Sequence, residues 1–130
     1  MDRRIIGLVA AILVCAACSG IDHGDIEGTT DVPDNYSSLS SGSGQMRTGI
    51  AIAFTPHVWT RNTCGGTSEQ SSNIVVQTSN PQVLHVSQVT DKDNQFVVWA
   101  VAPGHANVIV QYQGDTAMSI PVTVTDPPQM

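Results

Sequence analysis

The sequence predicts an all-β protein, a small sandwich of about seven short strands, on the basis of three observations. Short runs rich in β-branched and aromatic residues divide the second half of the chain, and strands favour that composition. Turn-forming residues, most clearly Asn80-Pro81 and Pro103-Gly104, separate these runs at regular intervals. No helical periodicity lies between them. The expected strands are residues 50–54, 74–78, 83–86, 96–102, 107–112 and 118–124.

Two prolines, Pro56 and Pro121, lie next to or within expected strands and limit how those strands can pair. Residues 118–124 alternate between apolar and other side chains, which is typical of a strand with one buried face. Pro121 lies inside this run and lacks an N–H, so it must lie where its strand has no ladder partner on that side, or at a bulge. Residues 50–54 also alternate, and Pro56 is expected to end that strand. Residues 57–60 would either extend it or form an edge piece.

Two segments have a recognisable order of turn and strand residues. Residues 76–86 contain an Asn-Pro turn followed by valines, and residues 98–108 contain a small-residue strand that ends in glycine. With the closing Val122-Thr123-Val124, this order resembles the group 2 bacterial immunoglobulin-like (Big) domain over about residues 49–125. Val76 stands where that family usually has Trp, and residues 61–72 are a polar insertion. The resemblance implies an immunoglobulin-like sandwich, here residues 46–126, with a tail at 127–130.

The amino terminus is typical of an export signal. Arg3-Arg4 precede an apolar run that is too short for a membrane span of about 20 residues. Small residues then precede Cys18, and the whole segment resembles a bacterial lipoprotein signal. In such a protein residues 1–17 would be removed and Cys18 acylated. An ordinary signal cut near Ala17 would leave Cys18 as a thiol. Ser19 after the cysteine implies the outer membrane, by the rule for lipoproteins of the enterobacterial type.

Residues 18–45 are expected to form a flexible tether. The segment has five acidic residues and no Lys or Arg, and it ends in a Ser/Gly-rich stretch. Such a composition buries too little apolar surface to offset the entropy lost on ordering. A flexible coil of this length would span about 30 Å.

Three residues are candidates for partner binding: Trp59, Cys64 and Trp99. Trp99 lies between Val98 and Ala100, which are assigned to the core, so its side chain should point outward. Exposed tryptophans could stack on sugar rings or anchor a protein, unless other segments cover them. Cys64 lies in the longest irregular stretch of the domain, 61–72. Its thiol would be buried, paired with another chain or, with His57 as a base, catalytic.

Several functions are not supported. The net charge is −6 and no basic patch occurs, which argues against nucleic-acid binding. The histidines at 23, 57, 85 and 105 share no metal-ligand spacing. Residues 91–94 begin like a calcium loop, but Gln95 and Phe96 stand where the loop needs an oxygen ligand and a glycine, and no glutamate closes it. No catalytic constellation, metal site or cofactor is predicted.

The sequence therefore predicts a non-enzymatic, lipid-anchored protein of the cell envelope, held at the outer membrane. Its immunoglobulin-like domain would bind a protein or a glycan, for adhesion or as an accessory subunit of a surface complex. The alternative is a tethered inhibitor or regulator of an envelope or extracellular hydrolase.

Overall fold

The computed structural model describes residues 20–28, 36–63, 65–70, 72–90 and 94–126. Within them the chain forms ten strands and no helix, and hence no helix that could cross a membrane. The strands are β1 (Gly20–Glu27), β2 (Ser38–Leu39), β3 (Gly44–Arg47), β4 (Ala51–Arg61), β5 (Thr67–Gln70), β6 (Ile74–Thr78), β7 (Leu84–Gln88), β8 (Phe96–Ala100), β9 (Gly104–Tyr112) and β10 (Asp115–Thr125). The predicted all-β class is confirmed.

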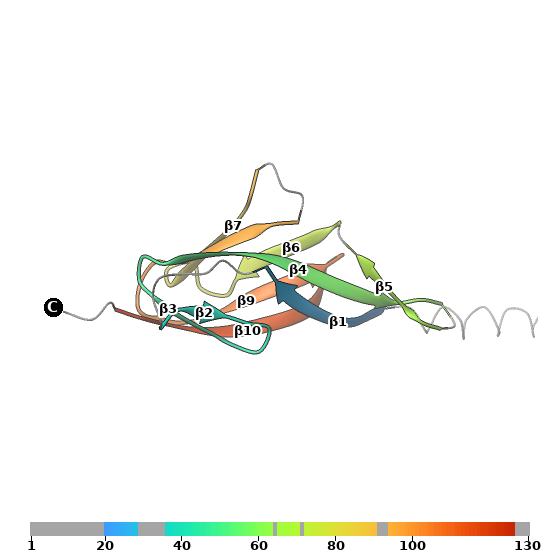
Figure 1. Ribbon diagram of the computed structural model, residues 1–130, viewed down its shortest axis with the longest axis horizontal. Coiled ribbons are helices and arrows are strands. Elements are labelled where there is room, and N and C mark those ends of the chain that lie inside the picture. The colour runs from blue at the N-terminus through green and yellow to red at the C-terminus, as the bar shows by residue number, and fades with distance from the viewer. Residues whose placement is uncertain (1–19, 29–35, 64, 71, 91–93, 127–130) are drawn as a thin grey trace, which may run out of the picture.

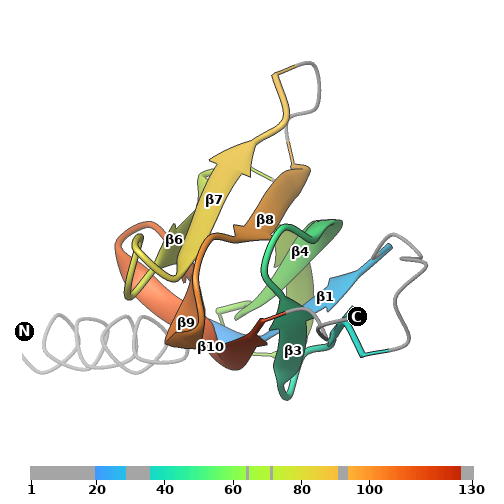
Figure 2. The ribbon, with the colours of Figure 1, turned by 90° about the vertical axis from the view of Figure 1, so that its left-hand side faces the viewer.

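The strands form two five-stranded sheets that face each other (Figure 1). The first sheet has the order β1-β4-β8-β7, and β5 also pairs with β4. The second has the order β2-β3-β10-β9-β6. All ladders are antiparallel except that between β3 and β10, which is parallel. Figure 2 shows the two layers from one end of the molecule.

The core lies between the sheets and is supplied by alternate residues of the long strands. The rings of Phe54 and Phe96, which are opposite residues of β4 and β8, stack within it, with centroids 6.2 Å apart. The buried apolar residues are Ile26, Leu39, Met46, Ile52, Phe54, Val58, Ile74, Val76, Val83, Leu84, Phe96, Val98, Ala100, Ala106, Val108, Val110, Ile120, Val122 and Val124. Alternation therefore indicated correctly which face of the expected strands is buried.

The expectation for Pro121 is confirmed. Pro121 lies opposite Asn107 in the β9–β10 ladder. Both backbone groups of Asn107 bond to Ser79 on the far side of β9, so the nitrogen of Pro121 faces β3 instead. The ladder with β3 begins only at Val122. No ladder bond is lost at the proline.

The expectation of a flexible tether over residues 18–45 is wrong for the part that the structure describes. Residues 20–27 form β1, which pairs along β4, and two further strands, β2 and β3, lie within residues 38–47. Ile26 and Leu39 are both buried in the core, as is Met46 directly after this segment. These few apolar side chains and the ladder with β4 order a segment whose average composition is polar.

Pro56 does not end its strand, contrary to expectation. β4 runs from Ala51 to Arg61, and its neighbour on one side changes from β8 to β5 around the proline. The carbonyl of Pro56 accepts a bond from the Asn94 side chain on that side. The nitrogen of Pro56 faces the same side, in the gap between the ladders with β8 and β5. No described strand pairs there, so the missing N–H costs no ladder bond and the strand continues. Residues 57–60 thus extend the strand.

Within residues 61–72, expected to be irregular, most of the described residues belong to a hairpin instead. β5 pairs back onto β4, with Thr67 opposite Arg61 and Gln70 opposite Val58. Asn62 closes the tip, because its N–H donates to the Gly66 carbonyl and its side-chain oxygen accepts from Ser68. The described tip residues are polar and exposed.

Candidate partner-binding surface

Trp59 and Trp99 both lie on the outward face of the first sheet, as predicted for Trp99. The inward neighbours Val58, Val98 and Ala100 are buried, whereas both tryptophans are half-buried. Ala51 is the β4 residue opposite Trp99, which places the two tryptophans eight positions apart along β4. At roughly 3.3 Å per residue they are about 26 Å apart and form two separate sites.

Each tryptophan stacks against a histidine on the neighbouring strand. The centroids of the His23 and Trp59 rings are 4.5 Å apart at 11°, and those of His85 and Trp99 are 4.1 Å apart at 18°. Both pairs are directly opposite residues of antiparallel ladders, which brings their side chains into contact. One face of each indole is therefore occupied, which leaves less aromatic surface for a sugar ring.

His57 links three strands on the same face. Its Nε2 is 2.6 Å from Oε1 of Glu27 on β1, although without hydrogen-bond alignment, and its Nδ1 contacts Oε1 of Glu69 on β5. The His57 side chain is 18% exposed, and its ring tilts against that of Trp59. Both ring nitrogens face carboxylates, so neither is open to act as a base on a substrate. The arrangement ties β1 and β5 to β4.

Two carboxylates of β1 have altered acidity. Hydrogen bonds from His23 and Arg61 hold the pKa of Asp22 below its usual value. A hydrogen bond from the Ser41 hydroxyl, then one from the Ile26 N–H, lowers the pKa of Asp25. In both cases the partners favour the charged form. The contact between Asp25 and Ser41 joins β1 to the β2–β3 turn.

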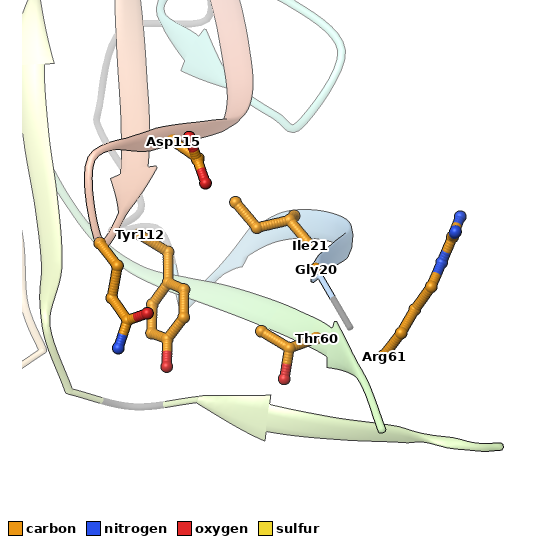
Figure 3. Close-up of a pocket in the computed structure, with 7 residues that line it drawn as sticks. Gly20, Ile21, Thr60, Arg61, Tyr112 and Asp115 are labelled. Carbon is orange, nitrogen blue, oxygen red and sulfur yellow. The ribbon is translucent and has the colours of Figure 1, made fainter. Parts of the chain in front are cut away.

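A shallow pocket of about 300 Å³ opens at the end of the sandwich where β1 begins. Its lining residues are Gly20, Ile21, Thr60, Arg61, Tyr112, Gln113 and Asp115. In Figure 3 the Asp115 carboxylate points toward Ile21, and the Arg61 side chain extends away from Tyr112. Arg61 donates to Asp22 at 3.2 Å. The pocket is polar, and its one cation is already paired.

The structure does not gather the three predicted binding residues into one site. Trp59 and Trp99 lie far apart on one sheet, and Cys64 and Cys18 lie outside the described residues. Among the residues that the structure describes, no three His, Cys, Asp or Glu side chains gather where they could hold a metal ion.

The histidines and glutamates around the tryptophans were not identified as a cluster from the sequence. His23 and Glu27 lie in the segment expected to be a tether, and Glu69 lies in the segment expected to be a loop. Cross-strand neighbours become visible only once the register is known. Had residues 20–27 been recognised as a strand, the pairing of His23 with Trp59 would have followed from the ladder.

No protein-family model matches the chain, and no characterised protein matches its sequence. Solved structures do resemble it. Domains 5–6 of the S-layer protein SbsC align with a TM-score of 0.55 and 15% identity over 85% of this chain and 47% of theirs. Domains 4 and 5 of the same protein align with a TM-score of 0.54 and 14% identity over 82% of this chain and 53% of theirs. The chain thus spans about half of each two-domain structure. At this identity the likeness shows the β-sandwich fold.

Proposed function

We propose that the chain is a non-enzymatic, lipid-anchored module of the cell envelope that presents one Big-like β-sandwich to a protein partner. It would act in adhesion or as an accessory subunit of a surface complex at the outer membrane. The observation that carries this proposal is the likeness of the sandwich to domains of an S-layer protein, which supports a cell-surface setting. The export signal and Cys18 supply the anchor.

The surface favours a protein over a glycan as the partner. A sugar-binding platform needs aromatic faces open to solvent. Here His23 and His85 each stack on one face of a tryptophan, and the two tryptophans are too far apart to act on one short sugar. Among the described strands, β1, β2, β6 and β7 lie at the edges of their sheets, and backbone groups at such edges can bind extended protein segments.

Inhibition of a hydrolase remains the second candidate. The β4–β5 hairpin projects from the end of the sandwich, as an inhibitory loop would (Figure 1). Its described tip residues, Asn62, Thr63, Gly65 and Gly66, carry no apolar side chain to fill a cleft. The hairpin therefore favours this function less than partner binding along the sheets.

Lipidation and partner binding can be tested in the same cells. Metabolic labelling with a fatty acid, followed by membrane fractionation, should place label and protein in the envelope, and Cys18→Ala should lose both. Chemical cross-linking in intact cells should then recover a protein partner with the anchored form. An unlabelled, secreted wild-type protein would overturn the anchor. Recovery of glycan alone would overturn the protein partner.

A further inference from the structure

We propose that two copies of this chain associate through the outer edge of β6, which joins their second sheets into one continuous sheet. Strand β6 is the last strand of its sheet and, among the described residues, has a ladder partner only in β9. The proposal rests on the backbone and the charges of this edge, and it does not depend on the lipid anchor.

The register shows which backbone groups of β6 point outward. Just beyond one end of the strand the Ser79 N–H donates to the Asn107 carbonyl of β9, and just before the other end the Asn73 carbonyl accepts from the N–H of Gln113, the residue after β9. Because backbone direction alternates along a strand, Val75 and Gln77 also bond to β9, whereas Ile74, Val76 and Thr78 present their N–H and C=O groups to the outside. A row of such groups is a template for another strand.

The outer edge also lacks the features that usually prevent pairing. Residues 70–90 contain no Asp, Glu, Lys or Arg, although the chain as a whole carries a net charge of −6. Strand β6 itself is Ile-Val-Val-Gln-Thr, without proline, and Val75 is 49% exposed. Natural edge strands are commonly protected by charges, prolines or bulges. This edge has none of them.

Charge and exposure together decide at which edge a second copy can pair. Of the uncharged edge strands, β2 has only two residues and β7 has no exposed large apolar side chain, whereas β6 has the exposed Val75. Two identical acidic chains repel each other wherever their charged surfaces meet. Self-pairing through β1, at the edge of the other sheet, would bring together strands that each carry Asp22, Asp25 and Glu27. Self-pairing through β6 opposes no charge to another.

Symmetry gives the register. A two-fold axis through Val76 lets all five residues of β6 pair antiparallel with their copies, with Ile74 opposite Thr78 and Val75 opposite Gln77 of the second copy. Each outward N–H then meets an outward C=O. The half-exposed Val75 is partly covered by the opposing Gln77 side chain.

The experiment compares the association of the full chain, kept dispersed in a mild detergent, with that of two matched variants. Val75→Lys/Gln77→Lys places ammonium groups directly opposite each other in both pairs of the proposed dimer. Gln45→Lys/Thr116→Lys makes the same change in net charge at exposed positions of β3 and β10. Sedimentation equilibrium should show a wild-type dimer. The first variant should raise its dissociation constant by at least about tenfold, whereas the second should not weaken it.

Hydrogen exchange gives an independent reading at single residues. The amides of Val76 and Thr78 should exchange more slowly as the wild-type concentration rises, while amides on other edges do not change. A monomer at all concentrations, equal effects of the two variants, or concentration-independent exchange at Val76 would each overturn the proposal. Binding of some other extended peptide to a monomeric chain would assign the same edge to a different partner and would also overturn it.

Discussion

Gly104 shows how a single residue determines the start of a strand. It follows Pro103 at the beginning of β9, with φ at +149°, and a Cβ there would lie 2.9 Å from Cγ2 of Val83. Backbone strain and the clash with a core valine both oppose a side chain. We therefore expect Gly104→Ala to lower the free energy of unfolding by about 1–3 kcal/mol.

Urea denaturation would measure this effect, with Gly42→Ala as the control. A Cβ at Gly42 would meet no atom within 4 Å, so that variant should change stability by no more than about 0.5 kcal/mol. Equal stability of the two variants would contradict the role assigned to Gly104.

Asp25 gives a prediction for pH dependence. Its pKa is lowered in the folded protein, chiefly by the Ser41 hydroxyl, so its contribution to stability is present above the unfolded pKa and is lost as pH falls through the folded value. Ser41→Ala should lower the free energy of unfolding at pH 7 by less than about 1 kcal/mol, because the carboxylate is exposed.

The difference between wild type and Ser41→Ala should shrink in acid, once Asp25 is protonated in both folded proteins. Urea midpoints followed from pH 7 down to about pH 2 would show it, because the lowered pKa of Asp25 moves its protonation in the folded protein to more acidic pH. A difference that persists unchanged in acid would mean that Ser41 acts through its other contact, with the Ile26 N–H at 3.2 Å.

At the scale of elements, β5 is the strand whose hold on the sheet can be tested most directly. It is four residues long and pairs only with β4 among the described strands, and side-chain contacts from Glu69 to His57 and from Gln70 to Thr60 add to the ladder. Removing the charge in Glu69→Gln should let β5 open more often. We expect its amides to exchange about 2–5-fold faster, as for the loss of one partly exposed side-chain contact to a carboxylate.

Amide exchange followed by NMR would separate this local opening from global unfolding. The amides at the centre of β9 should not change, and Asp115→Asn, which removes a charge of the same sign on β10, should leave β5 as it is. If exchange accelerated everywhere in Glu69→Gln, the contact would stabilise the whole fold instead of one strand.

Elements with a clear period of two were predictable, and those held by long-range pairing were not. Residues 118–124 and 50–54 alternate between apolar and small or polar side chains, so the sequence alone indicates both the strand and its buried face. In β1 only Ile26 is buried, and the order of the strand comes from its ladder with β4, whose paired residues lie 28 to 41 positions away in the chain. That partner cannot be read from local composition.

The same limit applies to the candidate surface. The outward direction of Trp99 follows from its buried neighbours, and this much was predicted. Its stacking on His85, and the position of His57 between two glutamates, depend on which strands are adjacent. At Pro56 the local sequence predicted an end that the strand does not have. Proline usually ends a central strand, but Pro56 lies between the part of β4 that pairs with β8 and the part that pairs with β5, where no neighbour needs its N–H.

At the scale of the whole molecule, the ordered β1 changes how the proposed anchor would hold the domain. Cys18 precedes Gly20, the first residue of β1, by two positions, and two residues span at most about 7 Å. The sandwich would then stand directly at the membrane surface, without a spacer of about 30 Å. The end with the β4–β5 hairpin would face the lipid, and the end of β10 would point away from it (Figure 1).

The two tryptophans can report this orientation. Trp59 lies opposite His23, near the start of β1. Trp99 lies on β8 opposite Ala51, which is about 26 Å from Trp59 along β4. In vesicles that contain an acceptor-labelled lipid headgroup, the lipidated chain with Trp99→Phe should transfer energy to the acceptor efficiently. The chain with Trp59→Phe should transfer it weakly, because transfer falls steeply with distance. Cys18→Ala, which lacks the anchor, should show little transfer in either background. Equal transfer from the two tryptophans in anchored chains would mean that the domain tumbles on a flexible linker. A result of that kind would contradict the direct attachment inferred from β1 while leaving the lipid anchor itself in place.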